Sequence, residues 1–399
     1  MNVAVIGCGA MGSATVYDLA CEGNNVLLID HDADRIRALL SWLADLKPKG
    51  RLEPVFLDVS NQHALTARLR GIDAAAIALP WSLTRLAISA ALEVACPVAS
   101  IARPNLDDLA ALDRAAREQR AQVLLPCGLE PGLTEILARH AVLQIDNATG
   151  LHIRCGGIPV NPTPPLGYKI LFGRSLPIAL RDAYVVECRQ LRKVPRFSGR
   201  ESFYVEGVGE VEAFHDGMLP WFAEDPDIGN VDTVTQKTIR WPGFAEKILV
   251  LAELGLLSEE PVPVGDVKVA PRQVVDAVLY PKVSWAAGDE DLTILLVEAV
   301  GFKGGHSVRF QVTLVDRYDP QTRLTAMART TGFTLAAVTR LLGRGRIEGV
   351  GWIQPQRVIT GELLTALLDD LRHRGIHIEM FLLPEVSSSS AIIRTDRRC

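Results

Sequence analysis

Three glycines near the amino terminus have the types and the spacing of a phosphate-binding turn. Gly7, Gly9 and Gly12 form a G-x-G-x-x-G run directly after the apolar segment Asn2–Ile6. The first glycine allows a tight turn out of a strand, the second lets the backbone approach a pyrophosphate, and the third lets a helix lie close to the sheet. A diphosphate would meet free N–H groups and the positive end of a helix dipole there.

An acidic residue ends the second apolar segment, Asn25–Asp30. Asp30 lies roughly 20 residues past the glycines, where βαβ units place the acid that accepts hydrogen bonds from the ribose hydroxyls of adenosine. Strand, turn, helix and acid together predict a dinucleotide site. A carboxylate at this position would repel a 2′-phosphate, which favours NAD over NADP. Arg35 could bind that phosphate if the loop turned, so NADP remains the alternative.

Further cofactor contacts are expected where other strands end, because the carboxyl ends of parallel strands face the ligand crevice. Asp58 could flank the adenine, and it could equally cap a helix. The turn after the buried run Ala74–Leu79 should lie near the pyrophosphate or the nicotinamide. The predicted cofactor-binding residues are Gly7, Gly9, Ala10, Met11, Gly12, Asp30, His31, Asp58, Val59, Leu79 and Pro80.

Composition excludes several classes of function. The chain has 399 residues, of which 48% are hydrophobic and 22% charged, values typical of a globular protein. A formal net charge of −5 provides no basic field for nucleic acid. The apolar runs are far shorter than a membrane span, and the first strand leaves no room for a signal peptide, so we expect a cytoplasmic protein. The seven cysteines form neither C-x-x-C nor a Cys/His pattern, which predicts reduced thiols and no metal.

Alternating strand and helix patterns up to about residue 125 predict a doubly wound parallel sheet, and therefore an α/β protein. We predict a dinucleotide-binding domain over residues 1–130 and an α+β substrate and dimerisation domain over 131–325, with a mostly antiparallel sheet. Helices over 326–380 are expected to return to the first domain. A polar tail over 387–399 is expected to fray. Among the expected elements are a single strand over Val262–Val267 and proline-rich turns over Ile158–Pro165.

Several motifs give the chain a resemblance to the saccharopine dehydrogenase family. The runs that begin at Gly128, Cys155 and Pro165 read G-L-E-P-G-L, C-G-G-I-P and P-L-G-Y-K, which are similar to motifs of the saccharopine reductases. The runs E-A-F-H from Glu212, K-T-I-R-W from Lys237 and A-M-A-R-T-T-G from Ala326 look more like the lysine 6-dehydrogenases. The resemblance extends from Val3 to about Ile376. It implies a nicotinamide-dependent oxidoreductase acting at a carbon–nitrogen bond of an amino acid, and a homodimer.

Two departures from the family pattern lie in the expected substrate region. The run Asp216–Trp221 stands where lysine 6-dehydrogenases tend to have glycines and threonines, and Glu130 stands where they tend to have a small residue. Lysine therefore does not carry over directly as the substrate.

Oxidation of an amine needs a carboxylate holder, a proton acceptor and a dry pocket at the nicotinamide. Arg240 is the first choice for the carboxylate, because a guanidinium forms a bidentate fork, and Arg329 is the second. Cys155 and Gly156 complete the predicted substrate-binding set. Each could instead have a structural role: a salt bridge for Arg240, a docking helix for Arg329, and core packing for Cys155.

The predicted residues for proton transfer are Glu130, His215, Lys237 and Tyr168. Burial beside a cofactor could raise the pKa of Glu130 into a useful range, and a histidine needs little tuning. Lys237 would need desolvation, and Tyr168 could instead hold substrate through its hydroxyl. Alternatively, Glu130 could be a carboxylate paired structurally across the hinge, His215 a hydrogen-bonded core histidine, and Lys237 an exposed lysine.

Three functions are therefore considered. The first is an NAD-dependent amino acid dehydrogenase resembling lysine 6-dehydrogenase. The second is a saccharopine-type reductase that condenses an amine with a carbonyl acid, which requires more arginines facing the cofactor. The third is a nicotinamide-binding sensor without turnover.

Overall fold

The computed structural model describes residues 1–171 and 176–384, which form two compact units. Unit 1 comprises Met1–Leu137 and Asp319–Ile378, and unit 2 comprises Ala138–Tyr318 together with the chain from Glu379 onward. The predicted frayed tail lies outside the described residues.

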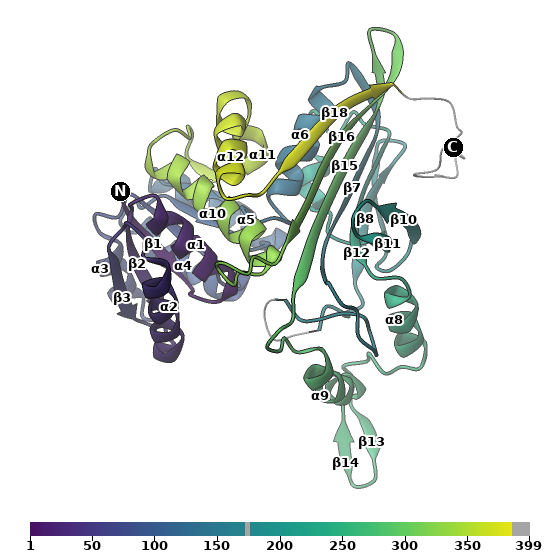
Figure 1. The fold of residues 1–399 in the computed structure, drawn as a ribbon, viewed down its shortest axis with the longest axis horizontal. Coiled ribbons are helices and arrows are strands. Elements are labelled where there is room, and N and C mark those ends of the chain that lie inside the picture. Colours follow the sequence, from purple (N-terminus) through teal and green to yellow (C-terminus); the bar gives the residue numbers. More distant parts are fainter. Residues whose placement is uncertain (172–175, 385–399) are drawn as a thin grey trace. The chain divides into compact units, whose positions relative to one another are not determined.

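Unit 1 is built on a seven-stranded parallel sheet in the order β17-β6-β5-β4-β1-β2-β3, as the sequence pattern predicts (Figure 1). Its strands are β1 (Asn2–Ile6), β2 (Asn25–Asp30), β3 (Leu52–Phe56), β4 (Ala74–Ile77), β5 (Val98–Ser100), β6 (Gln122–Leu124) and β17 (Gly351–Ile353). The central strands are buried apolar runs, which suits a sheet covered on both faces.

Helices of unit 1 come from both ends of the chain. The N-terminal ones are α1 (Ala10–Cys21), α2 (Ala33–Leu46), α3 (Gln62–Leu69), α4 (Trp81–Leu92) and α5 (Leu106–Glu118), with α6 (Leu133–Leu143) at the unit boundary. The C-terminal ones are α10 (Ala326–Gly343), α11 (Pro355–Val358) and α12 (Gly361–His373). Helix α10 packs on α1, β4 and β5 and also contacts α12.

A buried carboxylate joins these early and late helices. Asp18 on α1 has no exposed surface, and it accepts hydrogen bonds from Arg340 on α10 and Arg374 after α12. Arg340 also donates to Asp370 at 2.9 Å, and Arg374 to Glu22 at 2.7 Å. The cluster therefore pairs two buried or half-buried guanidinium groups with three carboxylates.

Unit 2 is built on a nine-stranded sheet whose main path runs β10-β11-β12-β7-β15-β16-β18, with β8 and β9 attached beside β12. The β12–β7 pair is parallel, and the pairs β10–β11, β11–β12, β15–β7 and β15–β16 are antiparallel. The strands are β7 (Asn147–Pro159), β8 (Asp182–Glu187), β9 (Gln190–Pro195), β10 (Glu201–Val205), β11 (Gly209–His215), β12 (Thr233–Arg240), β15 (Asp291–Lys303), β16 (His306–Arg317) and β18 (Ile378–Pro384).

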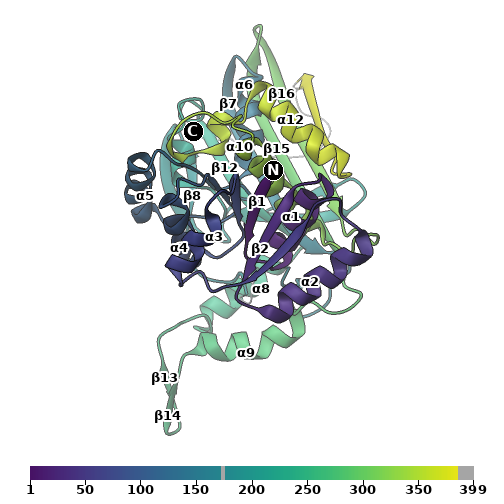
Figure 2. The same cartoon turned by 90° about the vertical axis from the view of Figure 1, so that its left-hand side faces the viewer.

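Helices α7 (Pro220–Ala223), α8 (Phe244–Glu253) and α9 (Pro271–Val283) complete unit 2. The expected single strand Val262–Val267 is wrong: β13 (Val262–Val264) and β14 (Val267–Val269) form a hairpin that extends beyond α9 (Figure 2). Gly265 has φ +60°, the left-handed conformation that the first residue of a type II′ turn needs. The proline-rich turns expected over Ile158–Pro165 begin two residues later than predicted, because β7 continues through Pro159 as a buried strand.

No helix in residues 1–171 and 176–384 is long and apolar enough to cross a membrane.

The Asp18→Asn variant should lose about 3–5 kcal/mol of unfolding free energy, because it leaves the Arg340 guanidinium buried with half of its countercharge removed. Urea unfolding of the full chain, followed by circular dichroism, measures this loss. Asp369→Asn is the matched control, since that carboxylate makes an exposed pair with Arg372 on α12, and it should cost about 0.5 kcal/mol or less. Equal losses in both variants would contradict a special contribution of the buried cluster.

Candidate functional site

The glycine turn of unit 1 has the geometry that a dinucleotide needs. Gly7 has φ +94°, and a Cβ there would lie 2.6 Å from the Ala78 carbonyl oxygen. A Cβ at Gly12 would lie 1.8 Å from the Gly7 oxygen. At Gly9, by contrast, a Cβ would meet nothing within 4 Å, so the backbone opens onto free space at the start of α1. That is where a pyrophosphate can reach the helix N–H groups.

Asp30 ends β2 beside this turn, and its carboxylate is occupied by donors. One oxygen accepts from the Cys8 N–H at 2.7 Å and the other from the Asp32 N–H at 2.9 Å. Nη1 of Arg35 lies 3.1 Å from both oxygens. His31 Nδ1 lies 3.3 Å from the carboxylate. The side chain of Asp30 is only 3% exposed, while that of Arg35 is 34% exposed.

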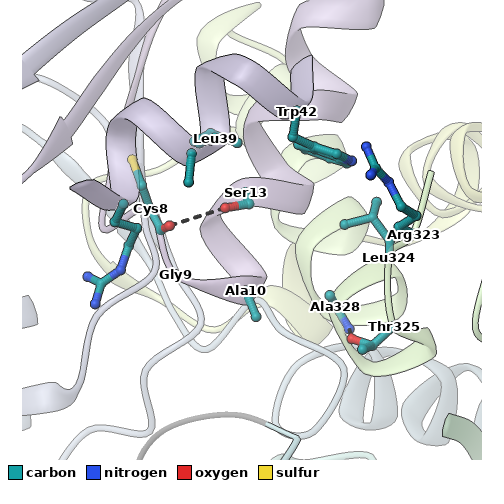
Figure 3. Close-up of a pocket in the computed structure, with 12 residues that line it drawn as sticks. Cys8, Gly9, Ala10, Ser13, Leu39, Trp42, Arg323, Leu324, Thr325 and Ala328 are labelled. Atoms are coloured by element: carbon teal, nitrogen blue, oxygen red, sulfur yellow. Dashed lines mark hydrogen bonds between the residues drawn. The ribbon is translucent and has the colours of Figure 1, made fainter. Parts of the chain in front are cut away.

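A cavity of about 510 Å³ adjoins the turn (Figure 3). Its walls come from the start of α1, from one side of α2, and from the segment that leads into α10. Its lining residues include Gly9, Ser13, Arg35, Trp42, Arg323 and Thr325. The volume is within the range of small-molecule sites. The open glycine backbone, the carboxylate of Asp30 at the end of β2 and the cavity together fit a nicotinamide dinucleotide.

The other predicted cofactor residues lie at the same edge of the sheet, with differing surroundings. Asp58 lies beyond the end of β3, and its Oδ1 accepts from the Ser60 N–H at 2.8 Å, which holds the pKa of this carboxyl below its usual range. Val59 is buried in the core. Leu79 follows β4 and would contact a Cβ at Gly7, and Pro80 is the N-cap of α4. Ala10 and Met11 begin α1.

In unit 2, one face of the sheet carries Arg240 and Tyr168. The guanidinium of Arg240 lies 4.9 Å from the ring centroid of Tyr168 and 5.7 Å from that of Phe244. Its Nη1 donates to the Ile239 carbonyl at 2.7 Å, while its Nε is buried without a hydrogen-bond partner. In the described part of the chain, no carboxylate lies within salt-bridge distance of Arg240. Burial raises the pKa of Tyr168, so its hydroxyl stays protonated.

The predicted residues Cys155 and Gly156 lie next to this arginine. Cys155 is paired in register with Thr238, so it shares the face of Arg240, and it is fully buried. A Cβ at Gly156 would lie 2.4 Å from the Ile239 oxygen and 3.1 Å from Nη1 of Arg240. Gly156 is therefore required by the close approach of β12.

A second charge cluster on this face was not predicted from the sequence. Asp216 is 4% exposed and binds Arg196 at 2.7 Å, Arg181, and Thr238 Oγ1 at 3.3 Å. Burial alone would raise the pKa of Asp216, but the two arginines lower it. Arg196 and Asp216 are 20 residues apart, and no sequence spacing indicates that they meet.

His215 and Lys237 lie on the opposite face of the same sheet. They are direct cross-strand partners in β11 and β12. Lys237 Nζ lies 3.2 Å from Glu201, which also accepts from Arg154 at 2.7 Å. Burial lowers the pKa of Lys237, although Glu201 opposes the shift. Strand alternation thus separates these two residues from Tyr168 and Arg240.

The turn before β10 fixes the imidazole of His215. Ser198 Oγ donates to the Pro195 carbonyl at 2.5 Å, so it accepts from Nδ1 of His215, 3.2 Å away. Gly199 packs over the ring, where a Cβ would lie 2.2 Å from Cε1. Burial, followed by the charge of Lys237, lowers the pKa of His215 to about 4. The ring is therefore neutral at pH 7, with Nε2 as its acceptor.

Glu130 and Arg329 belong to unit 1. Glu130 lies half-buried in the turn between Gly128 and Gly132, which is closed by a Gly128 N–H to Pro131 carbonyl hydrogen bond of 3.0 Å. Arg329 on α10 donates to Asp319 at 3.3 Å and to the Arg374 carbonyl at 3.0 Å. These contacts hold the first turn of α10 to its neighbours in unit 1.

Comparison with known proteins covers nearly the whole chain. The saccharopine dehydrogenase NADP binding domain matches residues 3–123, and the saccharopine dehydrogenase C-terminal domain matches residues 128–376. The saccharopine dehydrogenase [NADP(+), L-glutamate-forming] of Pyricularia oryzae is 26% identical over 267 residues, which cover 63% of this chain and 57% of that protein. The mitochondrial alpha-aminoadipic semialdehyde synthase of Bos taurus is 22% identical over 94% of this chain and 47% of its own length.

The chain thus spans about half the length of these curated relatives. A solved structure, apo saccharopine dehydrogenase (L-Glu forming) from Saccharomyces cerevisiae, has the same fold, with a TM-score of 0.79 at 19% identity over 96% of this chain and 99% of that one. With the nucleotide turn in unit 1, the mixed sheet of unit 2 and both domain models matched in order, the chain belongs to the saccharopine dehydrogenase family of oxidoreductases.

Proposed function

We propose that this protein is an NAD-dependent oxidoreductase that acts at a carbon–nitrogen bond of an amino acid, whose carboxylate is held by Arg240. The observation that carries this proposal is the buried guanidinium of Arg240, which lacks an acidic partner among the described residues. Its cross-strand neighbour Glu212 is buried too, but the carboxylate of Glu212 accepts from the Gly243 and Ala245 N–H groups instead. A buried guanidinium that forms no ion pair is costly, so a site of this kind favours an anionic ligand.

The surroundings of Arg240 support binding of a planar carboxylate. Tyr168 and Phe244 pack against the guanidinium, which restricts its orientation. One N–H of Nη1 is used by the Ile239 carbonyl, and Nε keeps a donor with no partner. An arginine presents its donors as a fork, and a carboxylate can accept two of them in parallel. The buried hydroxyl of Tyr168 remains available as a donor beside the same group.

The division of the sheet into two faces supports a choice among the proton-transfer candidates. A substrate that is held by Arg240 cannot reach His215 or Lys237 through the sheet. Tyr168 is kept protonated by burial. Among the predicted proton-transfer residues, Glu130, which the family motif around Gly128 carries, stays our candidate for a proton acceptor. With the nicotinamide bound, the carbon that bears the amine can then lose its hydrogen as hydride.

The residues around the ribose site support NAD. A 2′-phosphate would approach the carboxylate of Asp30, which would repel it. Asp32 and Asp58 add negative charge nearby, since the charge of His31 helps to lower the pKa of both. The matching domain and the Pyricularia oryzae relative are named for NADP, so the proposed preference for NAD rests on these local carboxylates.

A saccharopine-type reductase is the second candidate, and the named activity of the Pyricularia oryzae relative favours it. Saccharopine carries more carboxylates than lysine, and each needs a cation. Arg154 and Arg196, two other buried arginines of this sheet, are already bound to Glu201 and Asp216. These pairs favour a substrate with a single carboxylate at Arg240.

Initial rates over a panel of amino acids distinguish the two candidates. NADH formation from lysine or another diamino acid at alkaline pH is expected for the dehydrogenase. Cofactor oxidation that requires both an amine and a carbonyl acid would instead support the reductase. Binding of NAD without turnover of any member of the panel would contradict both and leave the sensor.

The Asp30→Asn variant should raise the KM for NAD about 10- to 100-fold, because the ribose hydroxyls lose an ionised acceptor. The KM for NADP should rise less or fall, since a negative charge that faces the 2′-phosphate is removed. Asp34→Asn is the control, because Asp34 is on the same segment but is exposed and pairs with Arg37. Unchanged NAD binding in Asp30→Asn would exclude this residue from the ribose site.

The Arg240→Gln variant should raise the KM for the amino acid about 10- to 100-fold, because the carboxylate loses a charged hydrogen-bond donor. The parent enzyme should discriminate strongly between the amino acid and its carboxamide, and the variant should not. Arg189→Gln, which removes an exposed arginine paired with Asp232 in unit 2, should leave both values unchanged. A variant that still rejects the carboxamide would place the substrate carboxylate elsewhere.

A further inference from the structure

The carboxylate of Asp30 is already saturated before any ribose arrives. A carboxylate offers about four lone-pair positions. Two are used by the Cys8 and Asp32 N–H groups, at 2.7 and 2.9 Å. The remaining positions face Nη1 of Arg35, which lies 3.1 Å from each oxygen, and His31 at 3.3 Å. The two hydroxyls of an adenosine ribose are also donors, so they compete for the same oxygen atoms.

Arg35 is the donor best placed to leave. The two backbone N–H groups belong to the turn itself and cannot withdraw without rearranging it. The Arg35 side chain, by contrast, is one-third exposed and lines the 510 Å³ cavity beside Gly9 and Ser13. Its Nη2 also lies 3.5 Å from Asp32, so the guanidinium has a second carboxylate to hold when it releases the first.

We propose that Arg35 competes with the cofactor ribose for the carboxylate of Asp30 and thereby shifts the selectivity between NAD and NADP. Binding of NAD displaces the guanidinium from Asp30 without giving it a new anion. The adenosine ribose of NADP keeps only its 3′-hydroxyl as a competing donor, and its 2′-phosphate takes up the released guanidinium as a charge-assisted partner. The same residue therefore opposes NAD and favours NADP. The inference rests on the proposed nicotinamide site and adds the residue that governs its selectivity.

The test is the sign of the change in affinity for each cofactor. Dissociation constants of NAD⁺ and NADP⁺ are measured by calorimetry on the full chain, without amino acid, so that the result does not depend on catalysis. In Arg35→Met, which keeps the length of the apolar stem but has no donor, NAD⁺ should bind about 3- to 10-fold more tightly and NADP⁺ about 10-fold more weakly. Adenosine 5′-monophosphate and adenosine 2′,5′-bisphosphate should repeat this pattern.

Two further variants complete the design. Arg37→Met removes an exposed arginine from the next turn of α2, where it pairs with Asp34, and should change neither constant. Arg35→Lys keeps the charge and should retain most of the NADP⁺ affinity. It also tests the proposal if Arg35→Met does not fold.

Opposite changes in the dissociation constants of NAD⁺ and NADP⁺ would support this competition. Weaker binding of both would overturn it, since Arg35 would then orient Asp30 for the ribose rather than compete with it. Unchanged binding of both would also overturn it. Failure of the proposed function is a separate outcome: turnover would be absent from every variant while the opposite shifts in affinity persisted.

Discussion

The carboxylate of Asp18 holds together helices that the chain makes first and last. It lies in the last turn of α1, the helix whose start forms the nucleotide turn, and it binds Arg340 on α10 and Arg374 after α12. Close packing accompanies this charge cluster. A Cβ at Gly332 on α10 would lie 2.6 Å from the Met11 oxygen, and Thr15 Oγ1 donates to the Gly332 carbonyl at 3.0 Å. The position of α1, and with it the glycine turn, therefore depends on residues more than 300 positions away.

The sheet of unit 2 carries charged groups on both of its faces. Arg240 and Asp216 lie on one face, and Lys237, Glu201 and Arg154 on the other. Lys237 and Arg154 are paired with Glu201, and Asp216 with Arg196, whereas Arg240 has no ion pair among the described residues. Since alternate residues of β12 point in opposite directions, the run from Lys237 to Arg240 supplies both faces at once. This alternation explains why residues that are neighbours in a motif do not act together.

The nucleotide turn could be predicted from sequence because all its parts are local. Strand, glycines and acid lie within the first thirty residues, and their spacing alone implies the βαβ unit. Most strands and helices of unit 1 follow the expected ranges for the same reason. The competition of Arg35 for Asp30 could not be predicted, since it depends on the distances from one guanidinium to two oxygen atoms.

The candidate site of unit 2 was harder to predict because its contacts join distant segments. Arg196 meets Asp216 through the fold of two hairpins, and Ser198 meets His215 in the same way. The sequence motifs led us to propose Arg240, Tyr168 and Lys237 together, but they did not indicate that the sheet separates Lys237 from the other two. The hairpin over 262–269 was missed because Gly265 turns the chain within a run of valines.

The discontinuity of unit 1 has a consequence for how the protein is made. Residues 1–137 leave the ribosome long before residues 319–378, yet the two segments share one core. Until α10 is synthesised, the buried surface of α1 that receives Gly332 and the carboxylate of Asp18 have no partner. Unit 2 is continuous up to Tyr318 and can fold first, in the interval between the two halves of unit 1. The nucleotide-binding unit begins the chain, and it is completed only after all of unit 2 except its edge strand β18 has been made.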